Sequence, residues 1–177
     1  MGLITKEYHA SPTMAQFHQS DLEFRYIEGP VGSGKSTACV MELLRLAMLQ
    51  QPDEHRVRRS KWAIIRSTNP QLRSTTIKTF SMWIPSSVAP VVYNAPINAT
   101  MIERLSDGTT LEVEFIFLAL DLEEDIEKLT SLEVTGAYIN EGREIVKAHI
   151  EVLKGRIDRF PQTIKDENGK TLYGPTN

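Results

Sequence analysis

Eight consecutive residues near the N-terminus combine three glycines, a lysine and a serine at a spacing that suits a phosphate group. They are Gly29, Pro30, Val31, Gly32, Ser33, Gly34, Lys35 and Ser36. Glycines let the backbone turn tightly and bring N–H groups against phosphate oxygens. Lys35 supplies a cation for the β- and γ-phosphates, and Ser36 a hydroxyl for Mg²⁺. The pattern G-x-x-x-x-G-K-[ST] therefore predicts a nucleoside triphosphate site, with Thr37 at its end.

The residues on either side test this prediction, because a phosphate-binding loop follows a strand and opens a helix. Phe24 to Glu28 carries aromatic and β-branched residues, which predicts a strand. Thr37 to Leu49 is mostly apolar, which predicts a helix that packs on a sheet and ends before Pro52. Both halves of the required context are therefore predicted.

Runs typical of strands and helices alternate along the rest of the chain. The expected strands are 61–66 and 134–139, with a hairpin over 102–118 that turns at Asp107-Gly108. The expected helices are 70–83, 121–129 with Asp121 as N-cap, and 143–157. This order predicts a three-layer α/β P-loop NTPase fold (ASCE, RecA-like) with a mainly parallel central sheet and a β-hairpin insertion. Ligands bind at the carboxyl ends of such strands, where Gly29, Arg66 and Asn140 should gather.

A second candidate for chemistry lies at the end of the strand 134–139. A Walker B motif is an apolar strand ending in Asp-Glu, in which the Asp helps to hold Mg²⁺ and the Glu polarises the attacking water. Here the two positions are Asn140 and Glu141. The amide oxygen of Asn140 can reach a metal-bound water, and Glu141 is placed to be the catalytic base. The alternative is that the pair only caps the next helix, since Asn is a favoured N-cap; the intact loop favours catalysis.

Composition and missing motifs narrow the function further. The run Asn-Lys-x-Asp, which GTPases use for guanine, does not occur, so ATP is the expected nucleotide. A Glu directly after the metal-side residue is typical of ATP-driven motors. The net charge is −3, so any contact with nucleic acid must be local or shared among several copies. The single cysteine, Cys39, allows no internal disulfide, which fits a reducing compartment.

The combination of motifs resembles one protein family. The resemblance runs from about residue 8 to the end of the chain, and its runs are 29–36, 62–79, 118–121, 136–144, 155–161 and 174–177. The most specific part is Asn-Glu-x-Arg-Glu at 140–144 followed by Gly-Arg-x-x-Arg-Phe-Pro at 155–161. These runs resemble the N-terminal ATPase domain of the large terminase subunit of tailed bacteriophages, the DNA-packaging motor. Asn140 departs from the general Walker B rule but resembles one branch of these terminases.

The resemblance implies ATP hydrolysis that drives double-stranded viral DNA into a procapsid, in the cytoplasm of the infected bacterial host. It also implies the portal protein and the small terminase subunit as partners, and a homo-oligomeric ring, although an isolated chain could be monomeric. Residues 1–177 would form the ATPase domain and stop inside the coupling motif, Thr176-Asn177. The nuclease domain would then be absent, so no DNA cleavage is expected from this chain.

Three residues before the loop are candidates for binding the base. Gln16 resembles the glutamine with which related motors read the adenine edge, because a side-chain amide both donates and accepts. The alternative is a surface residue on an N-terminal helix. Phe17 or Tyr8 could stack on adenine, with core packing as the alternative role.

Several arginines could stabilise charge during phosphoryl transfer. Arg66, at the end of a strand, could contact phosphate, hold Glu141 in an inactive pose or form a structural ion pair. An arginine finger often comes from the next subunit of a ring. Its candidates are Arg143, Arg156, Arg159 and, on the hairpin, Arg104, and a surface salt bridge is the alternative for each.

Two other functions remain open from the sequence. A helicase-like or DNA-repair P-loop ATPase would typically be stimulated by single-stranded DNA. A non-hydrolysing nucleotide binder would have Asn140 as the mark of lost catalysis. The basic run 55–61 could contact DNA, but its place before a strand predicts a solvated loop at the sheet edge opposite the nucleotide.

Overall fold

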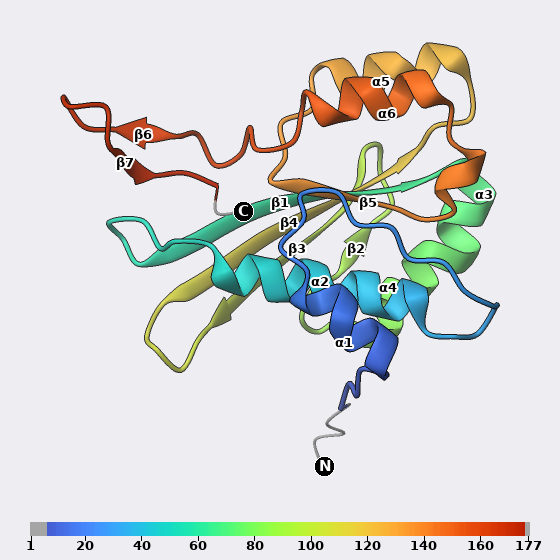
Figure 1. Ribbon diagram of the computed structural model, residues 1–177, viewed down its shortest axis with the longest axis horizontal. Helices are drawn as coiled ribbons and strands as arrows, with labels where there is room; N and C mark the ends of the chain where they lie inside the picture. The colour runs from blue at the N-terminus through green and yellow to red at the C-terminus, as the bar shows by residue number, and fades with distance from the viewer. Residues whose placement is uncertain (1–6, 176–177) are drawn as a thin grey trace.

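The computed structural model describes residues 7–175 and centres on a five-stranded sheet with helices on both faces (Figure 1). The strands are β1 (Val57–Arg66), β2 (Val91–Val92), β3 (Ile97–Arg104), β4 (Thr110–Ala119) and β5 (Gly136–Ile139), in the spatial order β2-β3-β4-β1-β5. β1 is parallel to β4 and β5, whereas β3 is antiparallel to β2 and β4. Because only β3 runs against the others, the predicted mainly parallel sheet is confirmed.

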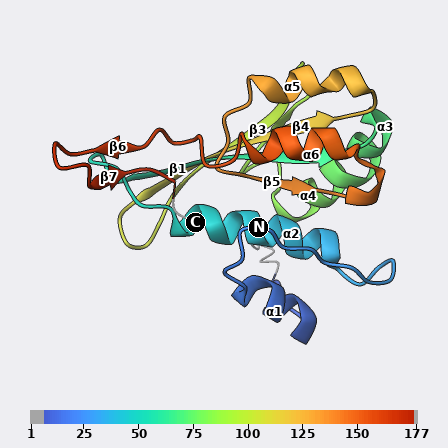
Figure 2. The same cartoon turned by 45° about the horizontal axis from the view of Figure 1, so that its top comes forward.

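Helices cover the sheet on two sides. One side carries α2 (Lys35–Leu49) and a continuous helical run, made of α3 (Asn69–Gln71), the π-helical segment η1 (Leu72–Ile77) and α4 (Lys78–Trp83). The other carries α5 (Ile126–Thr130) and α6 (Lys147–Lys154), as Figure 2 shows. The short 3-10 turns η2 (Glu123–Asp125) and η3 (Gly142–Glu144) precede α5 and α6, and α1 (Pro12–Gln19) packs on α2. The three-layer α/β architecture is confirmed, while its assignment to the ASCE branch stays a prediction.

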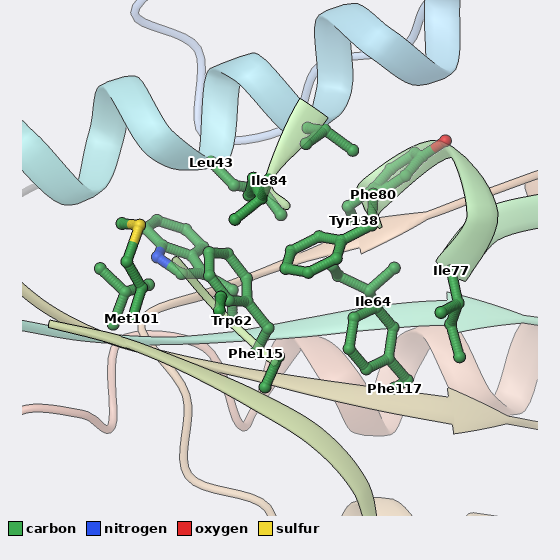
Figure 3. Close-up of a cluster of buried hydrophobic side chains, with 14 of the residues drawn as sticks. Leu43, Trp62, Ile64, Ile77, Phe80, Ile84, Met101, Phe115, Phe117 and Tyr138 are labelled. Atoms are coloured by element: carbon green, nitrogen blue, oxygen red, sulfur yellow. The ribbon is translucent and has the colours of Figure 1, made fainter. Parts of the chain in front are cut away.

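Two buried apolar clusters fix the layers to each other. The first lies between the sheet, α2 and α4, where the ring of Phe80 meets those of Phe115 and Phe117 edge-on at 4.8 and 5.1 Å (Figure 3). The second lies under α5 and α6 and includes Ile65 and Leu129. β1 and β4 contribute to both clusters, as expected for strands that are buried on both faces. The carboxyl ends of the inner strands are therefore held rigidly.

The hairpin predicted around Asp107-Gly108 is present as β3 and β4. Gly108 has a φ of +77°, in the left-handed region that favours glycine. The side chain of Asp107 accepts hydrogen bonds from the backbone N–H and the hydroxyl of Thr109, at 2.8 and 2.6 Å. β4 pairs with β1 over its whole length, so the hairpin is part of the central sheet rather than an insertion into it. A second, small hairpin, β6 (Ile164–Lys165) with β7 (Thr171–Tyr173), has no counterpart in the sequence prediction.

The strand predicted at 24–28 is wrong. These residues have irregular structure, and the side chains of Phe24 and Tyr26 are 52% and 76% exposed. A strand inside a parallel sheet is covered on both faces, which this alternation of exposed aromatics does not allow. The guanidinium of Arg25 instead binds the carboxylate of Glu42 in α2. The segment is therefore attached to a helix and not to the sheet.

Smaller boundary predictions also change. Asp121 is not the N-cap of the acidic helix: the carboxylate of Asp125 accepts the backbone N–H groups of Asp121 and Leu122, at 2.7 and 3.0 Å. The predicted helix 143–157 is shorter, because a 3-10 turn precedes α6 and Gly155 ends it. None of the helices in the described part of the chain is both long enough and apolar enough to cross a membrane.

The basic run 55–61 is largely a strand and not a solvated loop. Its residues from Val57 onward form the start of β1. Arg58 lies 2.9 Å from the carboxylate of Asp107, and Lys61 lies 3.0 Å from that of Glu114. These partners lie on the neighbouring hairpin, so much of the basic charge is neutralised within the fold.

Candidate active site

The glycine-rich segment 29–34 forms an exposed loop that opens α2. Gly32 and Gly34 have φ values of +80° and +84°, and a Cβ at either position would meet no atom within 4 Å. Conformation, and not space, therefore requires glycine here. Gly34 is the N-cap of α2, which begins at Lys35 without a side-chain cap. The first N–H groups of the helix thus remain open to an anion, which the helix dipole also attracts.

The ammonium group of Lys35 lies against the loop that precedes it. Nζ donates to the backbone oxygens of Gly29 and Pro30 at 2.7 and 2.8 Å, and to the hydroxyl of Ser33 at 3.3 Å. No carboxylate in the described part of the chain forms an ion pair with it. The partners of the positive charge are therefore neutral carbonyl and hydroxyl groups, which suits a site that receives phosphate.

Tyr138 connects the loop to the neighbouring strand β5. Its side chain lies beside those of Ser36 and of Cys39, one turn further along α2. Burial is the main cause that raises the pKa of Tyr138, and the neighbouring Ser36 acts in the opposite direction. Burial also raises the pKa of the Cys39 thiol, to about 12. Both groups therefore stay protonated, and Cys39 is a buried free thiol.

Asn140 follows β5 directly and is held by both its backbone and its side chain. Its N–H donates to the carbonyl of Ile65 at 2.9 Å, and Nδ2 donates to Oγ1 of Thr76 at 2.9 Å. Thr76 belongs to the π-helical segment η1 and is 2% exposed. The side chain of Asn140 thus bonds to a helix packed on the sheet and does not cap the helix that follows.

Glu141 adopts a left-handed backbone conformation, with φ 59° and ψ 57°. Few residues other than glycine adopt this conformation, and such residues concentrate at functional sites. Its carboxylate is 3.8 Å from Nε of Arg143, and both side chains are well exposed. The carbonyl of Glu141 accepts the N–H of Glu144 at 2.9 Å, which fixes the turn. The carboxylate is therefore presented at the surface, at the carboxyl end of β5.

Arg66, at the end of β1, is almost fully buried and joins this group of residues. Nη1 donates to the backbone oxygen of Asn140 at 3.2 Å, and Nη2 is 3.5 Å from the carboxylate of Glu144. That carboxylate also accepts the hydroxyl of Ser67 at 2.6 Å. Nε of Arg66 has no hydrogen-bond partner among the described residues. Arg66 therefore forms an ion pair with Glu144 and does not hold Glu141. Its Nε–H group is left without an acceptor among the described residues.

The remaining candidate arginines lie at the other end of the sheet. The backbone of Arg156 and of Arg159 bonds to Val134, which precedes β5, at 3.2 and 3.1 Å. Both follow the end of α6 and lie outside it. Arg104 pairs in register with Thr110, at the amino end of β4. Within one chain, these three arginines therefore lie away from Lys35 and Asn140.

A pocket of about 340 Å³ lies beside the phosphate-binding loop. Its lining includes Tyr8, Met14, Ser33, Gly34, Thr37 and Trp83. The rings of Tyr8 and Trp83 meet edge-on at 5.9 Å, and Nε1 of Trp83 donates to the hydroxyl of Thr37 at 3.1 Å. Gln16 is exposed on α1 and does not line the pocket, and Phe17 packs against the first apolar cluster. The aromatic wall next to the loop is therefore made by Tyr8 and Trp83.

The oxygen atoms at the site suit Mg²⁺ bound together with phosphate. In the described residues, no group of three His, Cys, Asp or Glu side chains could hold a metal ion. Mg²⁺ commonly takes only one or two protein oxygens, with phosphates and waters as the other ligands. The hydroxyl of Ser36 and the amide oxygen of Asn140 are protein oxygens of this kind.

Sequence reasoning missed three residues of this site: Thr76, Trp83 and Tyr138. A signal existed for Tyr138, because it precedes Asn140 by two residues and strand side chains alternate, so both face the same side. No comparable signal marked Thr76 or Trp83, whose contacts with Asn140 and Thr37 join distant segments.

Comparison with known proteins gives a likeness of fold. No protein-family model matches the chain, and no curated protein matches it in sequence. The large terminase from a thermophilic bacteriophage aligns with a TM-score of 0.55 and 16% identity over 72% of this chain. The chain has a fold similar to that of a large terminase. The family resemblance predicted from the sequence is thus confirmed at the level of fold.

The same terminase has also been solved with nucleotides. Its complex with ADP aligns with a TM-score of 0.54 at 15% identity, and its complex with ATP-gamma-S with 0.52 at 14% identity. The latter alignment covers 80% of this chain. This chain spans only 29–30% of the length of these terminase structures. The similarity therefore concerns one part of the larger protein.

Proposed function

We propose that this chain is the ATPase unit of a viral DNA-packaging motor, which binds ATP at residues 29–36 and hydrolyses it to move double-stranded DNA. The observation that carries the proposal is that the helical run 69–83 bonds to both parts of the site. Trp83 bonds to Thr37 directly after the phosphate-binding loop, and Thr76 bonds to Asn140 at the end of β5. Phosphate-binding and water-activating groups must be neighbours in an ATPase. The fold similarity to a terminase solved with ADP and with ATP-gamma-S supports the choice of nucleotide.

Phosphate binding is the task of the loop and of the start of α2. The open N–H groups at the start of α2 would face the phosphate oxygens. The ammonium of Lys35 would exchange its carbonyl partners, Gly29 and Pro30, for phosphate oxygens. Mg²⁺ bound by Ser36 and through Asn140 would neutralise charge on the β- and γ-phosphates. The side chain of Tyr138 in β5 lies beside that of Ser36.

Water activation is the task of Glu141. Its exposed pair with Arg143 spans 3.8 Å, and exposed pairs of this kind contribute only about 0–1 kcal/mol, so little holds the carboxylate in place. It is free to turn towards a water next to the γ-phosphate and to accept its proton. The left-handed backbone at Glu141 costs on the order of 1–3 kcal/mol, and β5 and the turn at Glu144 hold it there.

The base of the nucleotide would occupy the pocket between Tyr8 and Trp83. This pocket adjoins Gly34 and Thr37 at the start of α2, so a nucleotide whose phosphates lie in the loop can reach it. Aromatic edges and faces suit a planar purine. Gln16 lies outside the pocket lining, and a role for it in adenine recognition stays a prediction.

The motor context belongs to this proposal as well. The packaging motor would be a homo-oligomeric ring on the procapsid that contacts double-stranded DNA, the portal protein and the small terminase subunit, in the host cytoplasm. Because Arg104, Arg156 and Arg159 lie away from the loop of their own chain, any of them that acts as a finger would act on a neighbouring copy. Arg143, beside Glu141, is the candidate within the chain.

The test is ATP turnover with Mg²⁺ against protein concentration, with Glu141→Gln as the variant and the exposed Glu127→Gln as its control. We expect turnover per molecule to rise with concentration, and Glu141→Gln to bind ATP but not to hydrolyse it. Turnover by Glu141→Gln equal to that of the unchanged chain would refute the role of Glu141. Adding double- and single-stranded DNA separately distinguishes a packaging motor from a helicase-like ATPase, which prefers single strands.

A second function, a nucleotide binder without hydrolysis, is favoured by the contacts of Asn140. Its amide is already bonded to Thr76, and it brings no charge to the metal. This function predicts ATP binding without turnover at any concentration. It also predicts that Asn140→Asp gains no hydrolysis, whereas the motor proposal predicts Mg²⁺-dependent turnover in that variant.

A further inference from the structure

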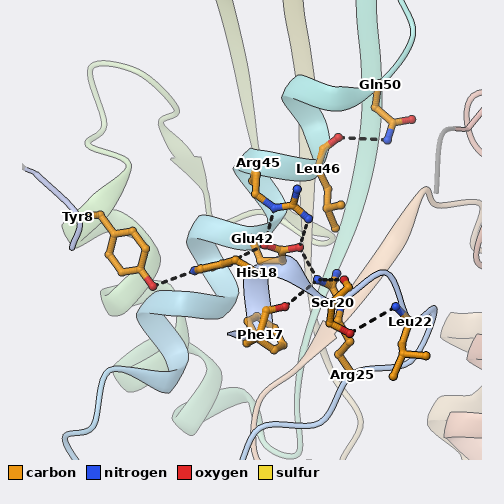
Figure 4. Close-up of polar contacts among 10 residues, drawn as sticks. All are labelled: Tyr8, Phe17, His18, Ser20, Leu22, Arg25, Glu42, Arg45, Leu46 and Gln50. Atoms are coloured by element: carbon orange, nitrogen blue, oxygen red, sulfur yellow. Dashed lines mark hydrogen bonds and ion pairs between the residues drawn. The ribbon is translucent and has the colours of Figure 1, made fainter. Parts of the chain in front are cut away.

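A buried carboxylate in α2, outside the groups used above, is bonded to two arginines and a histidine from three parts of the chain (Figure 4). The side chain of Glu42 is 3% exposed. Its oxygens lie 2.6 Å from Nδ1 of His18, 2.5 Å from Nη1 of Arg25, and 2.7 and 2.9 Å from Nη2 and Nε of Arg45. We call these four residues the Glu42 cluster.

A carboxylate is rarely buried without such partners, because leaving water costs several kcal/mol per ion. Burial by itself raises the pKa of Glu42, but the hydrogen bonds from Arg45, His18 and Arg25 outweigh it and hold the pKa below its usual value. The carboxylate is therefore charged and fully bonded. Removing the carboxylate would take a shared acceptor from all three partners, so the cluster has one strongly preferred arrangement.

The cluster attaches the segment before the phosphate-binding loop to α2. Arg25 also donates to the backbone oxygens of Phe17 and Ser20, at 3.3 and 3.4 Å, and its guanidinium lies 5.1 Å from the centre of the Phe17 ring. The segment 24–28 has no strand partner among the described residues, so these contacts replace the ladder of hydrogen bonds that a strand would have.

The cluster also extends to the pocket beside the loop. The second ring nitrogen of His18, Nε2, is hydrogen-bonded to the hydroxyl of Tyr8 at 2.9 Å. The rings of Tyr8 and His18 meet edge-on at 5.7 Å. Tyr8 in turn lines the pocket and contacts Trp83. Each ring nitrogen of His18 thus has one partner, Glu42 on one side and Tyr8 on the other, which fixes the ring between them.

We propose that Glu42 is a positioning residue of the nucleotide site, which acts through His18 to hold Tyr8 as the wall against the base and ribose. This inference rests on the proposed function, since it assigns the pocket to a nucleoside diphosphate or triphosphate. The inference concerns the nucleoside end of the ligand. Tyr8 lines the pocket and is not among the groups that bond to Lys35 in the loop. Glu42 itself touches no pocket surface and is not a catalytic residue.

The experiment compares ADP with inorganic pyrophosphate, both with Mg²⁺, by titration calorimetry on the whole chain. Tyr8→Phe removes only the hydroxyl that bonds to His18, and Glu42→Gln removes the charge with little change of shape. Tyr26→Phe is the matched control, because Tyr26 is 76% exposed. We expect each of the first two variants to weaken ADP about 3- to 10-fold, in the range of coupled network residues, and pyrophosphate less than about twofold.

The double variant Tyr8→Phe/Glu42→Gln separates a relay from two independent losses. A relay predicts that the double variant binds ADP no more weakly than the weaker single variant, because either change already frees Tyr8. If Glu42→Gln does not fold, His18→Asn takes its place in the same cycle.

Three results would overturn the inference: unchanged ADP binding by Tyr8→Phe, losses that multiply in the double variant, or an equal loss for pyrophosphate. If the unchanged chain binds neither ADP nor pyrophosphate, the proposed function fails, and the inference fails with it. If the unchanged chain binds both ligands and only the variants behave otherwise than expected, the inference alone fails.

Discussion

The ring of Trp62 fills the space that a side chain at Gly136, the first residue of β5, would need. The first prediction rests on this contact. A Cβ at position 136 would lie 2.5 Å from Cζ3 and 3.0 Å from Cε3 of Trp62. Ordinary contact begins near 3.4 Å, so the ring would have to retreat by about 0.9 Å (3.4 − 2.5). Trp62 is 4% exposed and its Nε1 donates to the hydroxyl of Ser60 at 3.0 Å. The ring has neither room nor freedom to move.

Gly136→Ala should therefore be strongly destabilising. Overpacking of a core costs about 1–3 kcal/mol, and the bonded ring places this site in the upper half of that range. At about 2–4 °C per kcal/mol for a chain of this size, the melting temperature should fall by about 4–12 °C. The measurement is urea and thermal unfolding followed by tryptophan fluorescence, since Trp62 is itself buried.

Gly142→Ala is the matched control for this prediction. Its Cβ would meet no atom closer than 3.8 Å, so stability should change little. Trp62→Phe, which shortens the ring, should lessen the harm of Gly136→Ala in the double variant. Gly136→Ala with the unfolding midpoint of the unchanged chain would show that β5 does not pack under Trp62 as described. The register between Trp62 and Gly136, which places Asn140 at the site, would then be wrong as well.

Three further predictions concern single contacts. Lys35→Ala should weaken ADP and pyrophosphate alike, at least about tenfold, with an unchanged melting temperature; selective loss of ADP in calorimetry would contradict this. Thr76→Val removes the acceptor for Asn140 and should cost about 1 kcal/mol in urea unfolding, and no cost would mean that the bond is dispensable. Because the pKa of Glu42 is lowered in the folded chain, its charged form stabilises the fold. This contribution is complete above the usual pKa of 4.5 and is lost as the pH falls through the lower pKa of the folded state. Glu42→Gln should therefore lose this dependence below about pH 4.5 in acid unfolding, and an unaltered acid limb would argue against it.

The sequence predicted the parts of the fold that depend on local patterns. The glycine-rich loop and α2, β1, the hairpin at Asp107-Gly108 and the strand before Asn140 all follow from spacing and residue type. The prediction of a strand at 24–28 was wrong. Its aromatic residues suit a strand, but the bond from Arg25 to Glu42 attaches the segment to α2 instead of the sheet. That bond joins residues far apart in sequence and leaves no local signal.

About half of the candidate site was predicted from the sequence. The loop and Asn140-Glu141 were found from motifs, because each motif is continuous in the sequence. Of the pocket only Tyr8 was named, because Tyr8 and Trp83 come from opposite ends of the first half of the chain and meet only in the folded protein. Glu42 was missed because a charged residue in a helix normally faces water, and only Arg45 among its three partners lies close to it in sequence.

The helical run 69–83 is a single rod that touches both halves of the site. Near its middle Thr76 bonds to Asn140, and at its end Trp83 bonds to Thr37 in the wall of the pocket. The π-helical segment 72–77 gives the rod a wide turn, a form that is rare and weaker than the α-helix. Asn140 and the Trp83 side of the pocket are therefore fastened to the same helical run, so the two parts of the site share one support.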